Sequence, residues 1–263
     1  MADFAAGERR WIDQLGGLRN TIRQELIARQ LAGHIAIGST VLDVGCGQGT
    51  QALRLAKGGC AVTGVDPSRK LLARFRASAA QSDLRVEMIE GSIALLNDVV
   101  GDRRFDVVMA HGLLNYLDDT RAALATLSER LAPAGILSFT FRNGHALAMR
   151  PALRRNWAGA LEALHSSSYV NELGVEAEAH RLEGIEVILH DLGLRIERWF
   201  GVRIFNDAMP SHSTVPGDDE LTALLEVEDR AGRQDPYRWM AAQFHVIASR
   251  ADGISSKVEK RLG

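Results

Sequence analysis

The stretch Val41-Leu42-Asp43-Val44-Gly45-Cys46-Gly47-Gln48-Gly49 decides the fold of this chain. Its first four residues predict a buried strand, and the three glycines predict a tight turn directly after it. A helical pattern follows over 51–58, and a second apolar strand over 60–66. Strand, glycine turn, helix and strand in this order are typical of a parallel sheet, in which ligands bind beyond the carboxyl ends of the strands.

The alternation of strands and helices continues beyond this unit. Further strands are expected over 84–91, 105–112 and 136–143, and helices between them over 68–81, 93–100 and 118–132. Strands reappear over 194–205 and 244–250, with a helix over 218–231 between them. Near-continuous apolar strands joined by long crossovers predict a doubly wound, Rossmann-like α/β fold with helices on both faces of the sheet.

Breaks in this pattern divide the chain into five parts. We expect an N-terminal helical cap over 1–36, a ligand-binding core over 37–143, a helical insertion over 144–192, the C-terminal part of the sheet over 193–250 and a tail over 251–263. The insertion is expected to be helical with one polar interruption at 165–174, and to face the substrate.

The composition excludes several classes of protein. With 263 residues, 46% of them hydrophobic, the chain is neither a small disulfide scaffold nor an intrinsically disordered protein. Its 31 Lys and Arg residues against 33 Asp and Glu residues produce no overall positive field for nucleic acid. Two cysteines predict neither a disulfide framework nor a metal site. The lack of a signal-peptide core or an 18-residue apolar run predicts a cytoplasmic protein with no membrane partner.

The spacing of the glycines narrows the class of ligand. A dinucleotide fingerprint requires G-x-G-x-x-G, but Thr50 stands at its sixth position. A phosphate-binding loop of the Walker type requires Gly-Lys-Ser or Gly-Lys-Thr, which does not follow. Asp66 ends the second strand, 21 residues after Gly45, where a carboxylate can accept two hydrogen bonds from the hydroxyls of a ribose.

The pattern Asp43-x-Gly45-x-Gly47-x-Gly49, together with Asp66, resembles the class I S-adenosylmethionine-dependent methyltransferases over residues 38–143. The resemblance implies a seven-stranded, mostly parallel sheet whose last strand is antiparallel. It also implies S-adenosylmethionine as the cofactor and no metal. Two further strand ends would line the cofactor site, with Ser92 and Ile93 against the adenine and His111 at the end of the fourth strand.

In that family the glycine loop packs against the amino-acid part of the cofactor, and the acidic residue after the second strand binds the ribose. The resemblance therefore assigns the first role to Gly45, Cys46, Gly47 and Gly49, with Asp43 before them, and the second role to Asp66.

A narrower resemblance extends along the rest of the chain. The segments 23–24, 141–143, 201–207 and 233–237, and above all LLEVEDRAGRQDPYRWMAAQFHVIAS at 224–249, are similar to the bacterial tRNA 5-carboxymethoxyuridine methyltransferase family. That family methylates the carboxylate of a modified wobble uridine. The resemblance implies that Arg23 pairs with the carboxylate of the cofactor.

The charge of the insertion is compatible with a second class of methyl acceptor. Residues 144–183 contain four arginines and five glutamates, whereas a tRNA anticodon arm needs several cationic contacts to phosphates. The alternative is an O- or N-methyltransferase of a small metabolite or natural product. A cofactor-binding protein without transferase activity is a third reading, and a homodimer is a further possibility that the sequence leaves open.

The identity of the acceptor decides which side chains are needed. A carboxylate acceptor is already an anion, so it requires no base, and arginine is the expected clamp; Arg203 and Arg233 are the candidates. An alcohol or phenol requires a base, for which His111 and His145 stand nearest the strand ends. Tyr116, just after the fourth strand, is expected to face the acceptor. Trp157 and Trp199 are expected to be core residues rather than stacking platforms for bases.

Overall fold

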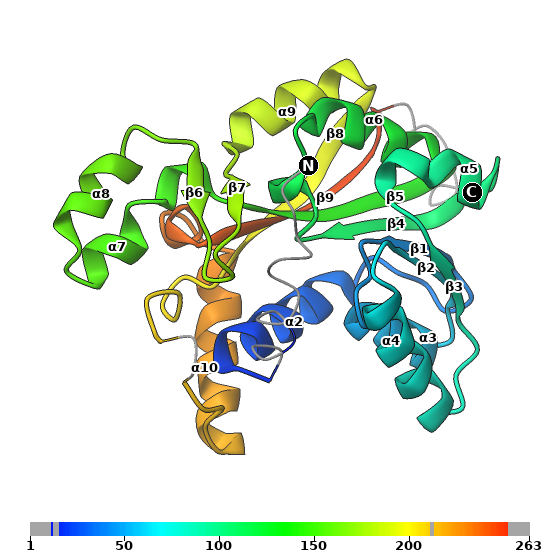
Figure 1. The fold of residues 1–263 in the computed structure, drawn as a ribbon, viewed down its shortest axis with the longest axis horizontal. Helices are drawn as coiled ribbons and strands as arrows, with labels where there is room; N and C mark the ends of the chain where they lie inside the picture. The colour runs from blue at the N-terminus through cyan, green and yellow to red at the C-terminus, as the bar shows by residue number, and fades with distance from the viewer. Residues whose placement is uncertain (1–11, 13–15, 211–212, 252–263) are drawn as a thin grey trace, which may run out of the picture.

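We describe a computed structural model of the chain, which covers residue 12 and residues 16–210 and 213–251. The expected helix before residue 16 and the tail after residue 251 lie outside the described residues, apart from residue 12. Seven strands form one sheet in the order β3-β2-β1-β4-β5-β9-β8 (Figure 1). Their bounds are β1 Thr40–Val44, β2 Ala61–Asp66, β3 Glu87–Glu90, β4 Phe105–His111, β5 Leu131–Arg142, β8 Leu194–Val202 and β9 Gln243–Arg250.

The pairing of these strands confirms the predicted fold. Strands β1 to β5 are parallel to one another, and Val41 of β1 lies opposite Val62 of β2 and Val107 of β4. The last strand, β9, is antiparallel to both of its neighbours, β5 and β8. Strand order therefore reverses beside β1, so the ends of β1 and β4 mark the point where ligands of such sheets bind.

Helices cover both faces of the sheet (Figure 1). On one face, α5, α6 and α9 contribute to an apolar cluster with β4 and β5, and on the other α2, α3 and α4 pack with β1 and β2. The longer helices are α2 Leu18–Leu31, α3 Thr50–Lys57, α4 Arg69–Gln81, α6 Thr120–Glu129, α9 Leu182–Asp191 and α10 Asp218–Gly232. The shorter ones are α5 Leu96–Val100, η1 Ile93–Leu95, η2 Leu114–Tyr116, η3 Gly144–Ala146 and η4 Tyr237–Met240.

The insertion contains a hairpin where only a polar interruption at 165–174 was expected between helices. Two short helices, α7 Met149–Leu153 and α8 Trp157–Ala163, are followed by a hairpin of β6 Ser168–Val170 and β7 Glu176–Glu178. The side chain of Asn171 stabilises the hairpin turn, since its Oδ1 accepts hydrogen bonds from the backbone N–H groups of Leu173 and Val175. Such turn-forming side-chain bonds have no helical periodicity, and the sequence pattern therefore missed them.

One tryptophan of the insertion was also predicted wrongly. Trp157 at the start of α8 is 61% exposed, and within this short helix only Ala160 is buried. Trp199 of β8 is partly buried and packs against Trp239 and Phe244, as the sequence predicted.

Candidate active site

The glycine loop lies at the carboxyl end of β1 and has a backbone that only glycine adopts easily. Gly45, Gly47 and Gly49 all have positive φ angles, of 73°, 56° and 78°. At Gly49 a Cβ atom would lie 2.2 Å from the ring of Phe75 on α4, so no larger residue fits there. The loop therefore keeps its shape through backbone conformation and through close packing on α4.

Asp66 connects this loop to the end of β2. Its Oδ2 accepts a hydrogen bond of 2.8 Å from the N–H of Gly47, and its Oδ1 accepts one of 2.8 Å from the N–H of Ser68. These bonds fix the plane of a carboxylate that lines the cavity described below. A carboxylate oxygen can accept more than one hydrogen bond, as binding of a diol requires.

Asp43 lies below the loop and is 4% exposed. Burial, and then the negative charge of Asp66, raise its pKa to about 7. Burial likewise raises the pKa of the Cys46 thiol, with Asp43 and Asp66 adding to the effect. A thiol in this state is not a nucleophile at neutral pH, so Cys46 serves as a small loop residue.

One cavity of about 280 Å³ opens beside the loop at this edge of the sheet, and we call it the carboxyl-edge cavity. Helix α2, the loops after β1, β2 and β4, and the β6–β7 hairpin all contribute to its wall. Its polar lining includes Arg19, Asn20, Arg23, Asp43, Asp66, His111, Asn115, Tyr116, Arg142, Arg150, Tyr169, Asn171, Glu172, Arg203 and Gln243.

His111 belongs to a chain of buried polar side chains. Its Nε2 lies 2.9 Å from Ser138 Oγ, which lies 2.8 Å from His245 Nε2, and His245 Nδ1 lies 2.7 Å from Gln30 Oε1. Burial, and then the charge of Arg23, lower the pKa of His111 to about 3. The ring is neutral at physiological pH and too weak a base to activate an alcohol. Its Nδ1 is buried and has no hydrogen-bond partner among the described residues, and the residue lines the cavity.

Four arginines surround the carboxylate of Asp207, and we call Arg19, Arg142, Arg150 and Arg203 the arginine cluster. Arg150 binds Asp207 through two hydrogen bonds of 2.8 and 2.7 Å, and Arg142 and Arg203 each lie 3.1 Å from one of its oxygens. Arg19 donates to the backbone oxygen of Asp207. Burial alone would raise the pKa of Asp207, but the arginines hold it well below its usual range.

The β6–β7 hairpin supplies a second carboxylate to this cluster. Glu172 pairs with Arg19 and lies 3.1 Å from Arg154 and 3.9 Å from Arg150. With Arg23, which is also buried, five guanidinium groups line the cavity and face the two carboxylates Asp207 and Glu172. The excess of positive charge makes this side of the cavity suited to an anion.

Arg203 has two features of a binding residue. Its backbone has a φ angle of 61°. Residues other than glycine rarely adopt this conformation, and those that do are often found at functional sites. Its side chain is 12% exposed, and its Nε has no hydrogen-bond partner in the described part of the chain. Burial, as the largest cause, lowers its pKa to about 10, so the group is still cationic at neutral pH.

Tyr116 also lines the cavity. Its hydroxyl accepts a hydrogen bond of 3.0 Å from Asn171 Nδ2, and burial, with Tyr169 nearby, raises its pKa to about 12. The ring of Tyr169 packs under the guanidinium of Arg142, 5.6 Å away. Tyr116 can therefore orient a ligand but cannot serve as a base at neutral pH.

The structure does not bring every predicted residue to the cavity. Arg233 pairs with Asp229 at 3.0 Å and stacks on Phe200, and His145 lies on the surface, 3.0 Å from Glu183. Both side chains are outside the cavity lining, because nearer carboxylates hold them. Ser92 and Ile93, at the start of η1, also lie outside the lining, and Ile93 packs on the core.

Sequence reasoning missed most of the arginine cluster. Arg142 was quoted only as part of 141–143, although its place at the end of β5 was a signal for a ligand-facing side chain. Arg150 is one of the four arginines counted in residues 144–183, and nothing in the sequence distinguishes it, Arg19 or Glu172. Within the described residues no helix is long and apolar enough to cross a membrane, and no group of three His, Cys, Asp or Glu side chains is arranged to hold a metal.

Comparison with known proteins finds relatives of the core alone and relatives of nearly the whole chain. Residues 41–135 match the family described as "Methyltransferase domain". The chain is 28% identical over 237 residues to the tRNA 5-carboxymethoxyuridine methyltransferase of Escherichia coli (strain K12), a match that covers 89% of this chain and 88% of that one. It is 32% identical over 146 residues to the ubiquinone biosynthesis O-methyltransferase of Pasteurella multocida, covering 51% of this chain and 60% of that one.

Among solved structures, magnesium protoporphyrin IX methyltransferase from Synechocystis PCC 6803 with bound SAH superposes with a TM-score of 0.62 at 17% identity. The match covers 94% of this chain and 97% of that one. A Burkholderia thailandensis 1,6-didemethyltoxoflavin-N1-methyltransferase matches with a TM-score of 0.58 at 15% identity, covering 95% of this chain and 84% of that one. At these identities the structures share the fold, while their acceptors differ.

Proposed function

We propose that this chain, an S-adenosylmethionine-dependent methyltransferase, methylates a carboxylate, namely that of 5-carboxymethoxyuridine in tRNA. The arginine cluster is the observation that carries the proposal. Guanidinium groups pair with carboxylates through two parallel hydrogen bonds, and here they lie in the wall of the cavity that also contains the glycine loop. The tRNA part of the proposal is supported by the relative from E. coli, whose match covers 89% of this chain.

The residues on the β1–β2 side of the cavity suit the cofactor. The carboxylate of Asp66 can accept hydrogen bonds from a ribose, the glycine loop allows close approach of a ligand, and the guanidinium of Arg23 can pair with a carboxylate. When bound, S-adenosylmethionine supplies a methyl group on a positively charged sulfur. We assign these three elements, with His111 beside them in the cavity lining, to cofactor binding.

The remaining residues position the acceptor. A carboxylate is an anion at neutral pH, so its methylation needs orientation and no proton transfer. The environment agrees with this requirement, because neither His111, with a pKa of about 3, nor Tyr116, with a pKa of about 12, can act as a base near pH 7. Arg203 would pair with the acceptor carboxylate, the other arginines of the cluster would add positive charge around it, and Tyr116 would orient the group that bears it.

A small acidic metabolite is the second candidate, and a specific observation favours it. Arg150 and Arg154 of the insertion turn inward, to Asp207 and Glu172, rather than outward to where phosphates of an RNA would lie. The cavity itself would accept a small carboxylate equally well.

Transfer of a labelled methyl group separates the two candidates. Purified protein with labelled S-adenosylmethionine is given bulk tRNA or a small-molecule extract, both from cells that lack this protein. We expect label in tRNA that mild alkali releases, as it does from an ester. The Asp66→Ala variant serves as the blank, because it removes an acceptor of cofactor hydrogen bonds. Label confined to the small molecules would reject the tRNA acceptor.

A further inference from the structure

A tRNA substrate requires cations for its phosphates, and the insertion offers few of them. Arg150 and Arg154 are held by Asp207 and Glu172, and Arg154 also donates to the backbone oxygens of Ala208 and Met209. Several arginines elsewhere on the surface also pair with acidic side chains. Examples are the pairs Arg121–Asp191, Arg195–Glu197 and Arg230–Glu226.

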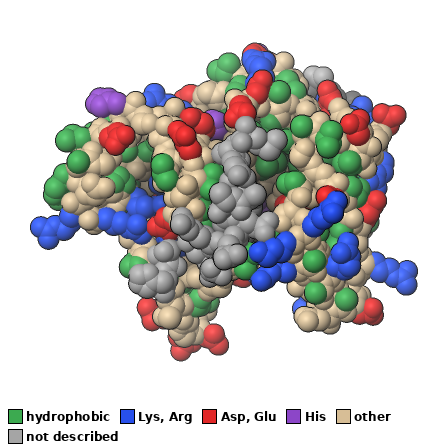
Figure 2. Space-filling view, in the orientation of Figure 1, with side chains coloured by type: hydrophobic (Ala, Val, Ile, Leu, Met, Phe, Trp, Pro, Cys, Tyr) green, Lys and Arg blue, Asp and Glu red, His purple; other side chains and the backbone are tan. Residues whose placement is uncertain are grey.

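Helix α4 carries a group of exposed cations. Its 13 residues contain four cations, Arg69, Lys70, Arg74 and Arg76, and no acidic residue. All four side chains are exposed, whereas Leu71, Leu72 and Phe75 face the core. Arg69 pairs with Glu90, but Arg74 and Arg76 form no ion pair with any described residue. Ala73 and Ala77 are exposed between the cations, so a backbone can approach this face closely. Figure 2 shows Lys and Arg side chains gathered over the part of the molecule formed by α3 and α4.

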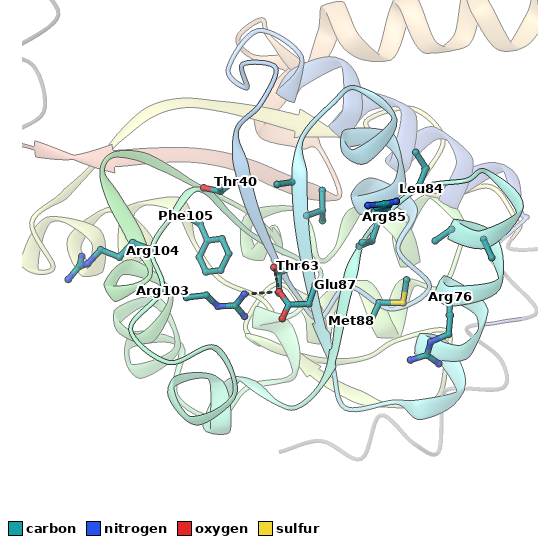
Figure 3. A pocket seen from close by; sticks show the side chains of 15 residues that line it. Thr40, Thr63, Arg76, Leu84, Arg85, Glu87, Met88, Arg103, Arg104 and Phe105 are labelled. Atoms are coloured by element: carbon teal, nitrogen blue, oxygen red, sulfur yellow. Dashed lines mark hydrogen bonds and ion pairs between the residues drawn. The ribbon is translucent and has the colours of Figure 1, made fainter.

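A hollow of about 830 Å³ lies at the opposite edge of the sheet from the active site, and we call it the amino-edge hollow (Figure 3). Residues at the amino ends of β1 to β4 form it, together with the C-terminal half of α4. Four arginines border it, with a single acidic side chain, Glu87. They are Arg76, Arg85, Arg103 and Arg104.

The charges in this hollow are only partly neutralised. Glu87 accepts hydrogen bonds from Arg103, at 2.7 Å, and from Thr63, at 2.8 Å. In Figure 3, Arg103 points toward Glu87, whereas Arg76 and Arg85 lie on one side of this pair and Arg104 on the other. Arg85 has no ion pair within the described ranges, and Arg104 donates only to a backbone oxygen, that of Leu131. Three cations therefore remain available to an anionic ligand.

Helix α4 connects the two sites. Leu71 in its first turn lines the carboxyl-edge cavity, and Arg76, Ala79 and Ala80 in its second half line the amino-edge hollow. A helix of 13 residues spans about 20 Å. The exposed cations of α4 lie in its first eight residues, which also contain Leu71 at the carboxyl-edge cavity and Arg76 at the amino-edge hollow.

We propose that the exposed face of α4 and the amino-edge hollow form a track for the phosphate backbone of the tRNA whose modified uridine occupies the carboxyl-edge cavity. The inference rests on the proposed function. It assigns to Arg74, Arg76, Arg85 and Arg104 a role in binding RNA that is separate from catalysis. Each phosphate that a cation neutralises releases counterions, so the track would make affinity for tRNA depend on salt.

The test is the triple variant Arg74→Gln/Arg76→Gln/Arg85→Gln. None of these residues lines the active-site cavity, so affinity for S-adenosylhomocysteine and kcat at saturating tRNA should match the wild type. We expect KM for tRNA to rise by about tenfold at physiological salt, and the slope of log affinity against log salt to fall by about 2 to 3. Gel-shift titrations at several salt concentrations measure the slope.

A second triple variant controls for the change in net charge. Arg121→Gln/Arg195→Gln/Arg230→Gln removes an equal number of positive charges, one each from α6, β8 and α10. This variant should leave KM for tRNA and the salt slope unchanged. Equal effects of the two triple variants, or a wild-type KM and slope in the α4 variant, would overturn the track while leaving the proposed function in place. Failure of the wild-type enzyme to methylate any tRNA would overturn both.

Discussion

The two sides of the carboxyl-edge cavity are built in opposite ways. The side formed by the glycine loop and Asp66 comes from one βαβ unit, residues 40–66, in which sequence neighbours are neighbours in space. The arginine cluster is assembled from α2, the end of β5, α7 and the segment after β8, and its bond between Arg19 and Asp207 joins residues 188 positions apart. A local motif can be read from spacing, whereas a long-range cluster requires the packed sheet to bring its members together.

The charges of the two sides differ as well. Asp43 and Asp66 make the loop side acidic, and their mutual repulsion contributes to the raised pKa of Asp43. The cluster side has an excess of guanidinium groups. An acidic side suits hydroxyl groups and a cationic cofactor, and a basic side suits an acceptor that is an anion.

The largest expected effect is a loss of turnover without a loss of cofactor affinity, produced by one substitution in the arginine cluster. Arg203→Ala should lower kcat/KM for the carboxylate acceptor by about 100-fold or more, because the acceptor loses a buried guanidinium that would pair with its carboxylate. Calorimetric affinity for S-adenosylhomocysteine should stay within about twofold, since measured losses would be confined to the acceptor side. Arg203→Lys keeps the charge and tests the two-point geometry of the guanidinium. Wild-type turnover in both variants would remove Arg203 from the site.

A smaller effect is expected from Asp43 on the acidic side, where its protonation makes the free energy of unfolding depend on pH. Because the folded-state pKa of Asp43 is about 7 and its usual value is 3.8, the folded protein binds a proton that the unfolded chain has already released. The contribution of Asp43 to stability is therefore fully present below about pH 4 and falls as pH rises to about 7, by at most about 1.4 kcal/mol per pH unit.

Asp43→Asn should flatten this part of the curve. The measurement is urea unfolding of ligand-free protein between pH 5 and pH 8, with Asp102→Asn as an exposed control. Identical pH dependence in wild type and Asp43→Asn would show that the carboxyl group is not held in its protonated form.

The smallest effect is expected at an arginine that sequence reasoning placed in the site. Arg233→Gln should change kcat and KM by less than about twofold, because this side chain pairs with Asp229 at the surface of α10 and lies outside the cavity lining. Steady-state kinetics beside Arg203→Ala would measure the difference between the two candidates. A loss comparable with that of Arg203→Ala would place Arg233 on the path of the acceptor after all.

The sequence by itself determined the fold and the side of the cavity formed by the glycine loop. Both depend on short-range rules: apolar strands alternate with amphipathic helices, Gly45, Gly47 and Gly49 supply positive φ angles, and Asp66 ends the next strand. The seven-stranded order with β9 antiparallel agrees with the resemblance that these residues carry.

Only the tertiary structure decided which charged side chains meet. Arg203 and Arg233 are equally plausible in sequence, but the chain after β8 directs one to Asp207, while the end of α10 leaves the other with Asp229. Tertiary contacts also turn Arg150 inward and leave Trp157 exposed, against expectation. The physical reason is that the sequence does not distinguish a solvated arginine from a buried one. The role of each arginine depends on the carboxylates that folding brings within hydrogen-bonding distance.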